Sequence, residues 1–224
     1  NQMNHSEMTA KMMIEIEKIL IIENPDGILV YGDTNSTLAG SLCAAKLNIP
    51  IFHVEAGLRS YNRSMPEEIN RILTDHLSSL LFCPTQNSFN ILKKEGITNG
   101  VLLSGDVMYD LFLKYRKKNN NIDYPYVIAT IHRPVNTDNP KKLSSIIKSL
   151  EKINKLKKVI FSAHPRTRKK MEDYGISTNI KIISPLKYFE MINYLSQADI
   201  VITDSGGLQK ESFFAKTKCL TIRN

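Results

Sequence analysis

The chain has 224 residues, of which 42% are apolar and 23% are charged, and its formal net charge is +8. This length suffices for one large α/β domain or for two lobes of about a hundred residues each. No run in the chain approaches the ~20 apolar residues of a membrane span, and its first residues lack the basic and apolar pattern of a signal peptide. We therefore expect no membrane partner.

Lysine and arginine concentrate in the second half, at 116–118, 155–158 and 166–170. No RNA-binding signature or aromatic interleaving accompanies these runs, so we expect no nucleic-acid partner and only a bias toward anionic small molecules. Three cysteines lie far apart in apolar contexts: Cys43, Cys83 and Cys219. They lack metal-ligand spacing and are expected to be buried and reduced, which favours the cytoplasm.

Short apolar strands alternate with helices along the first half of the chain. A helix is expected from a cap at Ser6 to about Glu23, with an apolar stripe of Met8, Met12, Ile16 and Ile19. The other expected elements are strands at 27–31, 51–54, 80–83 and 101–103 and helices to Leu47, from Pro66, at 86–94 and at 107–117. Proline suits the first turn of the helix at Pro66.

The polar, asparagine-rich segment 118–125 is the expected linker, after which the alternation restarts. The expected strands are 126–131, 158–162, 180–183, 199–203 and 219–222, and the expected helices are 141–153, 166–174, 187–195 and 208–215. Alternating strands and helices indicate parallel sheets with helices on both faces. We predict an α/β fold of two doubly wound Rossmann-like lobes, residues 1–117 and 126–224, with a cleft between them.

Acidic residues follow the strands of the first lobe: Asp33, Glu55 and Glu67. Residues just past the carboxyl ends of parallel strands lie where α/β sheets bind ligands. Paired carboxylates tuned to different protonation states serve acid and base chemistry. Two structural alternatives remain open, since Asp33 could cap the following helix and Glu67 could serve a helix dipole.

In the second lobe, Ser205-Gly-Gly207 follows a strand and opens a helix, which leaves backbone amides free to bind an anion. Glu211, one turn further on, could accept hydrogen bonds from a ribose or similar diol. His132 and Arg133 end the first strand of this lobe, where a histidine could serve as acid, base or phosphate partner. The chain lacks GxGxxG, Walker A and HExxH patterns, which removes the usual support for NAD, nucleotide-hydrolysis and zinc-protease functions.

Five motifs occur in order: Tyr31-Gly-Asp-Thr34, His53-Val-Glu-Ala-Gly-Leu-Arg59, Pro66-Glu-Glu-Ile-Asn-Arg71, Ile131-His-Arg133 and Thr203-Asp-Ser-Gly-Gly-Leu-Gln-Lys-Glu211. Over essentially the whole chain they resemble the non-hydrolysing UDP-N-acetylglucosamine 2-epimerase family, which includes UDP-diacetamido-glucuronate 2-epimerases. The resemblance implies a GT-B-like fold, as in UDP-glycosyltransferases and glycogen phosphorylase, with a UDP-sugar in the cleft.

The resemblance also implies interconversion of UDP-N-acetylglucosamine and UDP-N-acetylmannosamine for cell-surface polysaccharide precursors. In that family UDP leaves by anti elimination to give a 2-acetamidoglucal and is then added back. Neither a cofactor nor a metal is expected. The expected partners are the UDP-sugar, UDP-N-acetylglucosamine as an effector, and a second copy of the chain in a homodimer.

Carried over residue by residue, the resemblance implies two groups of site residues. The catalytic residues are Asp33, Glu55, Glu67 and His132. The substrate-binding residues are Arg71, Arg133, Leu186, Met191, Ser205, Gly206, Gly207 and Glu211. Within the second group, Arg71 is expected to orient the acids, the Ser-Gly-Gly segment to cradle the diphosphate, and Glu211 to accept from the ribose.

The chain departs from the family pattern at three places. Family members extend further at both ends, so we expect the chain to be truncated and these 224 residues alone to be inactive or nearly so. Met191 stands where many members have an aromatic residue against uracil, and Leu186 in the same loop could bind uracil only through its backbone. Val135 replaces a common glutamate, which is expected to alter the effector response.

Four other functions remain open. The chain could act on UDP-2,3-diacetamido-glucuronate, because the sugar pocket is not legible in the sequence. It could be a GT-B glycosyltransferase, although such an enzyme does not need three clustered acids. It could be an inactive UDP-sugar-binding fragment, or a hydrolysing epimerase that releases free N-acetylmannosamine.

Overall fold

The computed structural model describes residues 4–116, 122 and 124–222. It divides into two compact units, residues 1–107 and 108–224. This division comes earlier in the chain than the predicted linker at 118–125, most of which lies outside the described residues. No helix among the described residues is long and apolar enough to cross a membrane.

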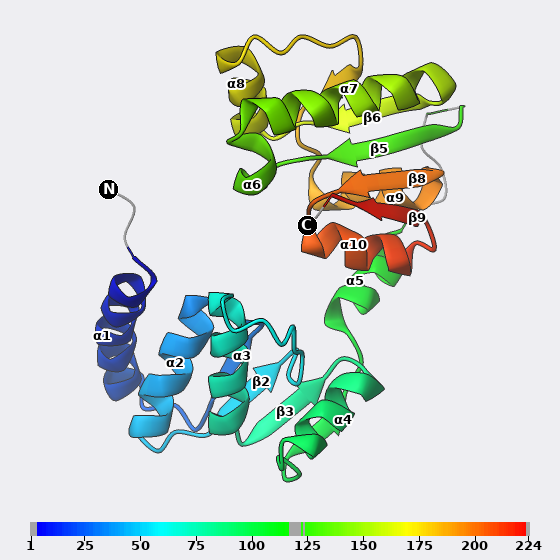
Figure 1. Cartoon of the computed structure of the whole chain (residues 1–224). Coiled ribbons are helices and arrows are strands. Elements are labelled where there is room, and N and C mark those ends of the chain that lie inside the picture. The colour runs from blue at the N-terminus through cyan, green and yellow to red at the C-terminus, as the bar shows by residue number, and fades with distance from the viewer. Residues whose placement is uncertain (1–3, 117–121, 123, 223–224) are drawn as a thin grey trace. The chain divides into compact units, whose positions relative to one another are not determined.

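The first unit contains a four-stranded parallel sheet in the order β1-β2-β3-β4. Its elements are α1 (His5–Glu23), β1 (Ile28–Tyr31), α2 (Asn35–Lys46), β2 (Ile51–Val54), α3 (Pro66–Leu77), β3 (Leu80–Cys83), α4 (Gln86–Lys94) and β4 (Val101–Leu103). Figure 1 shows α1, α2 and α3 side by side.

Helices α1, α2, α3 and α4 pack on one face of the first sheet. Val30 and Ile51 point to this face and join a core with α1 and α2, while Leu81 packs with Leu92 of α4. On the opposite face, Leu29 and Leu102 are about half exposed. The register explains which side chains share a face. Val30 pairs with His53 and His53 with Leu81, so these three side chains point to the same face, and their neighbours along each strand point to the other.

The second unit contains a five-stranded parallel sheet in the order β7-β6-β5-β8-β9. Its elements are α5 (Val107–Tyr115), β5 (Tyr126–Thr130), α6 (Pro134–Thr137), α7 (Pro140–Leu156), β6 (Lys158–Ser162), α8 (Pro165–Asp173), β7 (Lys181–Ile183), α9 (Tyr188–Gln197), β8 (Ile200–Thr203), α10 (Gly206–Phe214) and β9 (Lys218–Thr221).

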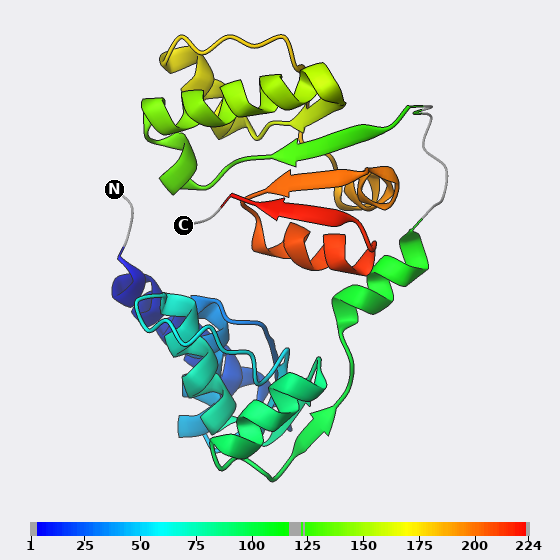
Figure 2. The same ribbon diagram turned by 45° about the vertical axis from the view of Figure 1, so that its right-hand side comes forward.

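The central strand β5 is buried on both faces. Val127 and Ala129 join a core with α7 and α8, whereas Tyr126 and Ile128 join a second core with α9 and α10. In Figure 2 the strands of this sheet lie between α7 and α10. A central parallel strand covered on both faces reads as a continuous apolar run, which is why it was predictable from the sequence.

Several expectations differ from the structure. Helices were expected on both faces of each sheet, but the described helices of the first unit lie on one face, because its strand order β1-β2-β3-β4 advances in one direction through right-handed crossovers. Helix α1 begins at His5 after Asn4 without a side-chain cap, so Ser6 is not the cap, and Ile19 is exposed while Leu20 is buried. Cys219 is exposed, contrary to the expected burial, because it lies on the outermost strand β9.

Helix α5 was expected in the first lobe, but all except its first residue groups with the second unit. The rings of Tyr109 and Phe112 lie 4.8 and 6.0 Å from the ring of Phe214 in α10, measured between centroids. These aromatic contacts, which local periodicity does not reveal, account for the grouping.

Candidate functional site

Asp33 follows β1, and Glu55 follows β2, at the same edge of the first sheet. Gly32 adopts a positive φ of 62°, and a Cβ atom built on it would lie 3.7 Å from Oε2 of Glu55. The Glu55 carboxylate therefore lies beside the turn at Gly32, and Asp33 is the next residue of that turn. Glu55 itself has a φ of 71°, which is costly for a residue with a side chain and is typical of strained functional positions.

The side chain of Asp33 does not cap helix α2, whose N-cap residue is Thr34. Instead its carboxylate Oδ2 lies 2.5 Å from a guanidinium nitrogen of Arg71 in α3. The same guanidinium contacts Glu68 at 3.1 Å. The structure therefore excludes the alternative that Asp33 caps helix α2, and it places Arg71 in contact with one of the predicted acids.

Glu67 and Glu68 are adjacent but occupy different environments. Glu67 and Asp33 line one hollow of about 300 Å³, together with His5, Met8, Met12, Thr34, Asn35, Ser36, Pro66 and Asn70. Glu68 is buried and accepts hydrogen bonds from the backbone N–H groups of Ser60 and Tyr61. Burial alone would raise the pKa of Glu68, but these bonds, the Ser60 hydroxyl and Arg71 outweigh it and lower that pKa.

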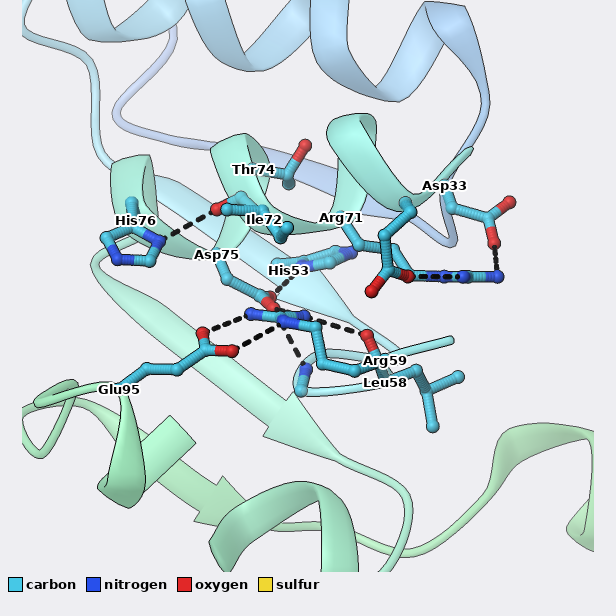
Figure 3. Close-up of polar contacts among 12 residues, drawn as sticks. Asp33, His53, Leu58, Arg59, Arg71, Ile72, Thr74, Asp75, His76 and Glu95 are labelled. Carbon is cyan, nitrogen blue, oxygen red and sulfur yellow. Dashed lines mark hydrogen bonds and ion pairs between the residues drawn. The ribbon is translucent and has the colours of Figure 1, made fainter. Parts of the chain in front are cut away.

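A buried charged network that was not predicted lies beside these acids. Figure 3 shows Asp75 of α3 between His53 and Arg59, with Glu95 on the far side of Arg59. Both His53 and Asp75 are fully buried. The positions of these residues in the sequence could have indicated the network. His53 and Arg59 lie in the motif that contains Glu55, and Asp75 lies one helical turn beyond Arg71.

In the second unit, His132 and Arg133 follow β5 and are held by Asp204, which follows β8. The backbone N–H groups of both residues donate to the Asp204 carboxylate, at 3.1 and 2.9 Å. Nδ1 of His132 lies 3.3 Å from the same carboxylate. Asp204 is fully buried, whereas the His132 side chain is 44% exposed. Asp204 therefore orients a ring that remains partly exposed. Asp204 lies in one of the five sequence motifs, but no role was predicted for it.

Helix α10 begins at Gly206, and Ser205 is its N-cap residue. The Ser205 hydroxyl accepts from the Leu208 N–H at 3.4 Å. A Cβ atom built on Gly207 would meet nothing within 4 Å. The glycine is therefore not required by packing, and open space lies beside the backbone where the predicted anion site is expected.

One pocket of about 250 Å³ gathers most of the predicted binding residues of the second unit. It is lined by Thr130, His132, Ser162, His164, Pro185, Leu186, Met191, Ser205, Gly207, Leu208 and Glu211. Arg133 and Gly206, which were also predicted, are not among these lining residues. Polar groups therefore occupy one part of the wall, while Leu186, Met191 and Leu208 supply an apolar part.

Glu211 is only 6% exposed, and burial raises the pKa of its carboxyl to about 7. Above pH 7 the folded chain holds a buried carboxylate, whereas below about pH 4.5 the group is neutral both folded and unfolded. Stability linked to this group therefore falls as pH rises between these values. A buried glutamate with such a pKa is typical of a functional pocket.

We expect Glu211→Gln to raise the free energy of unfolding at pH 8 by up to about 3 kcal/mol, because the neutral amide is cheaper to bury. The gain should shrink toward zero as pH falls to about 4.5. Urea unfolding at pH 8 and pH 5 measures both values, and exposed Glu172→Gln is the matched control. Equal stability of wild type and variant at pH 8 would contradict a buried charge at this position.

Two parallel sheets with polar residues gathered past the carboxyl ends of their strands define a Rossmann-like α/β protein whose second unit has a pocket suited to an anionic ligand. The UDP-N-acetylglucosamine 2-epimerase family model matches residues 1–224. The chain belongs to this family, as its motifs indicated.

A UDP-N-acetylglucosamine 2-epimerase homolog of Methanococcus maripaludis is 49% identical, over 99% of this chain and 66% of the relative. A UDP-2,3-diacetamido-2,3-dideoxy-D-glucuronate 2-epimerase of Pseudomonas aeruginosa is 45% identical, over 98% of this chain and 65% of the relative. The chain thus spans about two thirds of the length of these relatives.

The crystal structure of the Methanocaldococcus jannaschii UDP-GlcNAc 2-epimerase, in complex with UDP-GlcNAc and UDP, matches with a TM-score of 0.85 at 43% identity. The match covers 100% of this chain and 67% of that one. The predicted fold class, α/β with two GT-B-like Rossmann-like units, is confirmed.

Proposed function

We propose that the protein is a UDP-N-acetylglucosamine 2-epimerase in which the first unit supplies acid and base groups and the second binds the nucleotide. The observation that carries the proposal is the gathering of carboxylates around Asp33. Glu55 lies beside the turn that bears Asp33, and Glu67 lines the same hollow. Inversion at one carbon needs a proton acceptor on one face and a proton donor on the other, which requires more than one such group.

The proposed reaction has two balanced steps. A carboxylate removes the C2 proton of the sugar, the C2–H electrons form the C1=C2 double bond, and the C1–O bond breaks to release UDP. In the second step a UDP oxygen attacks C1 while a protonated group delivers a proton to C2 on the opposite face. Asp33, Glu55 and Glu67 are the proposed proton carriers, and Arg71 holds Asp33 in place.

The proposed nucleotide site is the pocket of the second unit. The free amides at Ser205, Gly206 and Gly207 would bind the diphosphate, whose charge increases as UDP departs. His132, backed by Asp204, would donate a hydrogen bond to the same group, and Arg133 would add positive charge. Glu211 would accept from the ribose.

The base would lie against the apolar wall of this pocket. Leu186 and Met191 line the wall and also pack against the core beneath it. We propose that Met191 contacts the uracil in place of an aromatic ring, and that Leu186 offers the base its backbone groups. A thioether side chain adapts to a planar ring without fixing its orientation.

The test is proton NMR of UDP-N-acetylglucosamine in deuterated water, incubated with the full-length protein, because the 224 residues alone are expected to be inactive or nearly so. We expect deuterium to enter C2 and the manno epimer to accumulate without any acceptor sugar. A glycosyltransferase would leave C2 unlabelled under these conditions. UDP binding without exchange, checked by calorimetry, would contradict the epimerase and leave a nucleotide-binding protein.

A second substrate is favoured by the 45% identity to the Pseudomonas aeruginosa UDP-2,3-diacetamido-2,3-dideoxy-D-glucuronate 2-epimerase. Running the same NMR assay with that nucleotide sugar in parallel compares the two substrates directly. The substrate with the larger kcat/KM is the one that the sugar pocket fits.

We further propose that the protein works as a homodimer in the cytoplasm, with UDP-N-acetylglucosamine as an effector. Its three cysteines are free thiols, which suits a reducing compartment. Sedimentation measures the assembly state. Rate curves for UDP-N-acetylmannosamine, with and without added UDP-N-acetylglucosamine, measure the effector response.

A further inference from the structure

His53 of β2 is fully buried, and both of its ring nitrogens face hydrogen-bond acceptors. Nδ1 lies 2.7 Å from Oδ1 of Asp75, and Nε2 lies 2.8 Å from the carbonyl oxygen of Gly32. A carbonyl oxygen only accepts. The positive guanidinium of Arg59 donates to the other oxygen of Asp75 at 2.6 Å, beside the Gly57 N–H at 3.1 Å, and this adjacent charge favours the ionised carboxylate. A ring that donates from both nitrogens is a charged imidazolium.

The surrounding charges stabilise a buried imidazolium. Arg59 is almost fully buried and pairs with Asp75 on one side and Glu95 on the other. Burial lowers the pKa of Arg59, but the hydrogen bonds and charges of Glu95 and Asp75 outweigh that effect and raise it. Two cations, His53 and Arg59, therefore face two anions, Asp75 and Glu95. Buried ions persist when they are paired and hydrogen-bonded in this way.

The imidazolium holds the turn that carries Asp33. Gly32 and Asp33 are consecutive, and side chains from two elements hold their carbonyl groups: His53 binds that of Gly32, and Asn70 of α3 binds that of Asp33 at 2.9 Å. The strand pairing does not need this contact, because the Gly32 N–H already donates to the Val54 carbonyl at 3.0 Å. The His53 bond is thus an addition beyond the β1–β2 ladder, directed at the turn.

We propose that His53 is a positioning residue, which as a buried imidazolium fixes the Gly32 carbonyl and so sets the direction of the Asp33 carboxylate. This inference rests on the proposed function, in which Asp33 carries a proton. Helix α3 then controls Asp33 by three routes. Arg71 binds its carboxylate, Asn70 binds its carbonyl, and Asp75 holds His53.

The first experiment is nitrogen-15 NMR of the wild-type protein with labelled histidine at pH 7.5. We expect the His53 ring to show two protonated nitrogens, each with a slowly exchanging proton. One unprotonated ring nitrogen would overturn the proposal. This measurement needs no turnover, so it remains decisive for His53 even if UDP-N-acetylglucosamine is not the substrate.

The second experiment compares His53→Gln with His53→Asn. The amide nitrogen of glutamine falls near the position of Nε2 and can still donate to the Gly32 carbonyl, whereas that of asparagine falls near Nδ1. We expect kcat to fall about tenfold in the glutamine variant and about a hundredfold in the asparagine variant. KM and the Kd for UDP should stay within about twofold, because the nucleotide pocket is built from residues of the second unit.

The matched control is His76→Gln, at an exposed histidine of α3 whose Nδ1 lies 2.9 Å from the Ile72 carbonyl oxygen (Figure 3). Its kcat should be unchanged. Equal losses in the two His53 variants, or losses that follow only the melting temperature, would overturn the positioning role. Loss of the fold in both variants would also overturn the positioning role, because His53 would then serve only the core. The wild-type spectrum would still report the charge of the ring.

Discussion

Asp33→Asn is expected to lower kcat for UDP-N-acetylglucosamine by about a thousandfold and to change the Kd for UDP by no more than about twofold. Asparagine has nearly the shape of aspartate but cannot carry a proton between substrate and solvent, and losing an acid–base group typically costs 10²–10⁴ in rate. The turn should survive, because His53 and Asn70 bind backbone carbonyls that the substitution leaves in place.

The measurement is deuterium entry at C2, followed by NMR, with calorimetry for UDP. Asp26→Asn, at an exposed aspartate before β1, is the matched control and should retain full turnover. If Asp33→Asn kept more than a tenth of the wild-type kcat, Asp33 would not be a proton carrier. Glu55→Gln and Glu67→Gln would then identify which of the two remaining acids removes the C2 proton.

Asp204→Asn is expected to lower the free energy of unfolding by about 3 kcal/mol and to weaken UDP binding by more than tenfold. The buried carboxylate of Asp204 accepts from the N–H groups of His132 and Arg133 and from the side-chain amide of Asn136. An asparagine has one acceptor oxygen and directs its own N–H₂ toward other donors. Buried donors left without acceptors cost about 1–3 kcal/mol each.

The weaker binding follows from the ring of His132, whose Nδ1 loses the carboxylate that orients it. Urea unfolding and calorimetry with UDP measure the two effects separately. Asp199→Asn is the matched control, because Asp199 pairs with Lys157 at an exposed position, where such pairs contribute about 0–1 kcal/mol. Equal stability losses in the two variants would contradict the central place of Asp204.

Most elements were predictable because each short apolar run ends in a polar turn. The strands at 51–54, 80–83, 101–103 and 158–162 and the helix at 86–94 have the predicted bounds. The single turn of helix α6 was not predicted. It begins at Pro134, directly after Arg133, and Asn136 within it reaches Asp204, a contact between residues 68 positions apart. Local periodicity carries no trace of such a contact.

The polar residues at strand ends were predictable for a similar reason, since parallel strands bring their carboxyl ends to one edge. The residues that hold them were not. Asp75 looks like any acid on an amphipathic helix, yet it is fully buried against His53, 22 positions earlier in the chain. Nothing in a single sequence distinguishes a charge satisfied in the interior from one in solvent. The predicted roles of the site residues stay predictions until the variants are measured.

The exposure of Cys219 makes the chain convenient for spectroscopy. Burial raises the pKa of the Cys43 thiol, and raises that of Cys83 to about 11, so both thiols are shielded and poorly nucleophilic at neutral pH. Cys219 is the exposed thiol on the outer strand of the second sheet. A maleimide dye is therefore expected to attach at Cys219 while Cys43 and Cys83 stay in place, which labels one defined strand of the second unit.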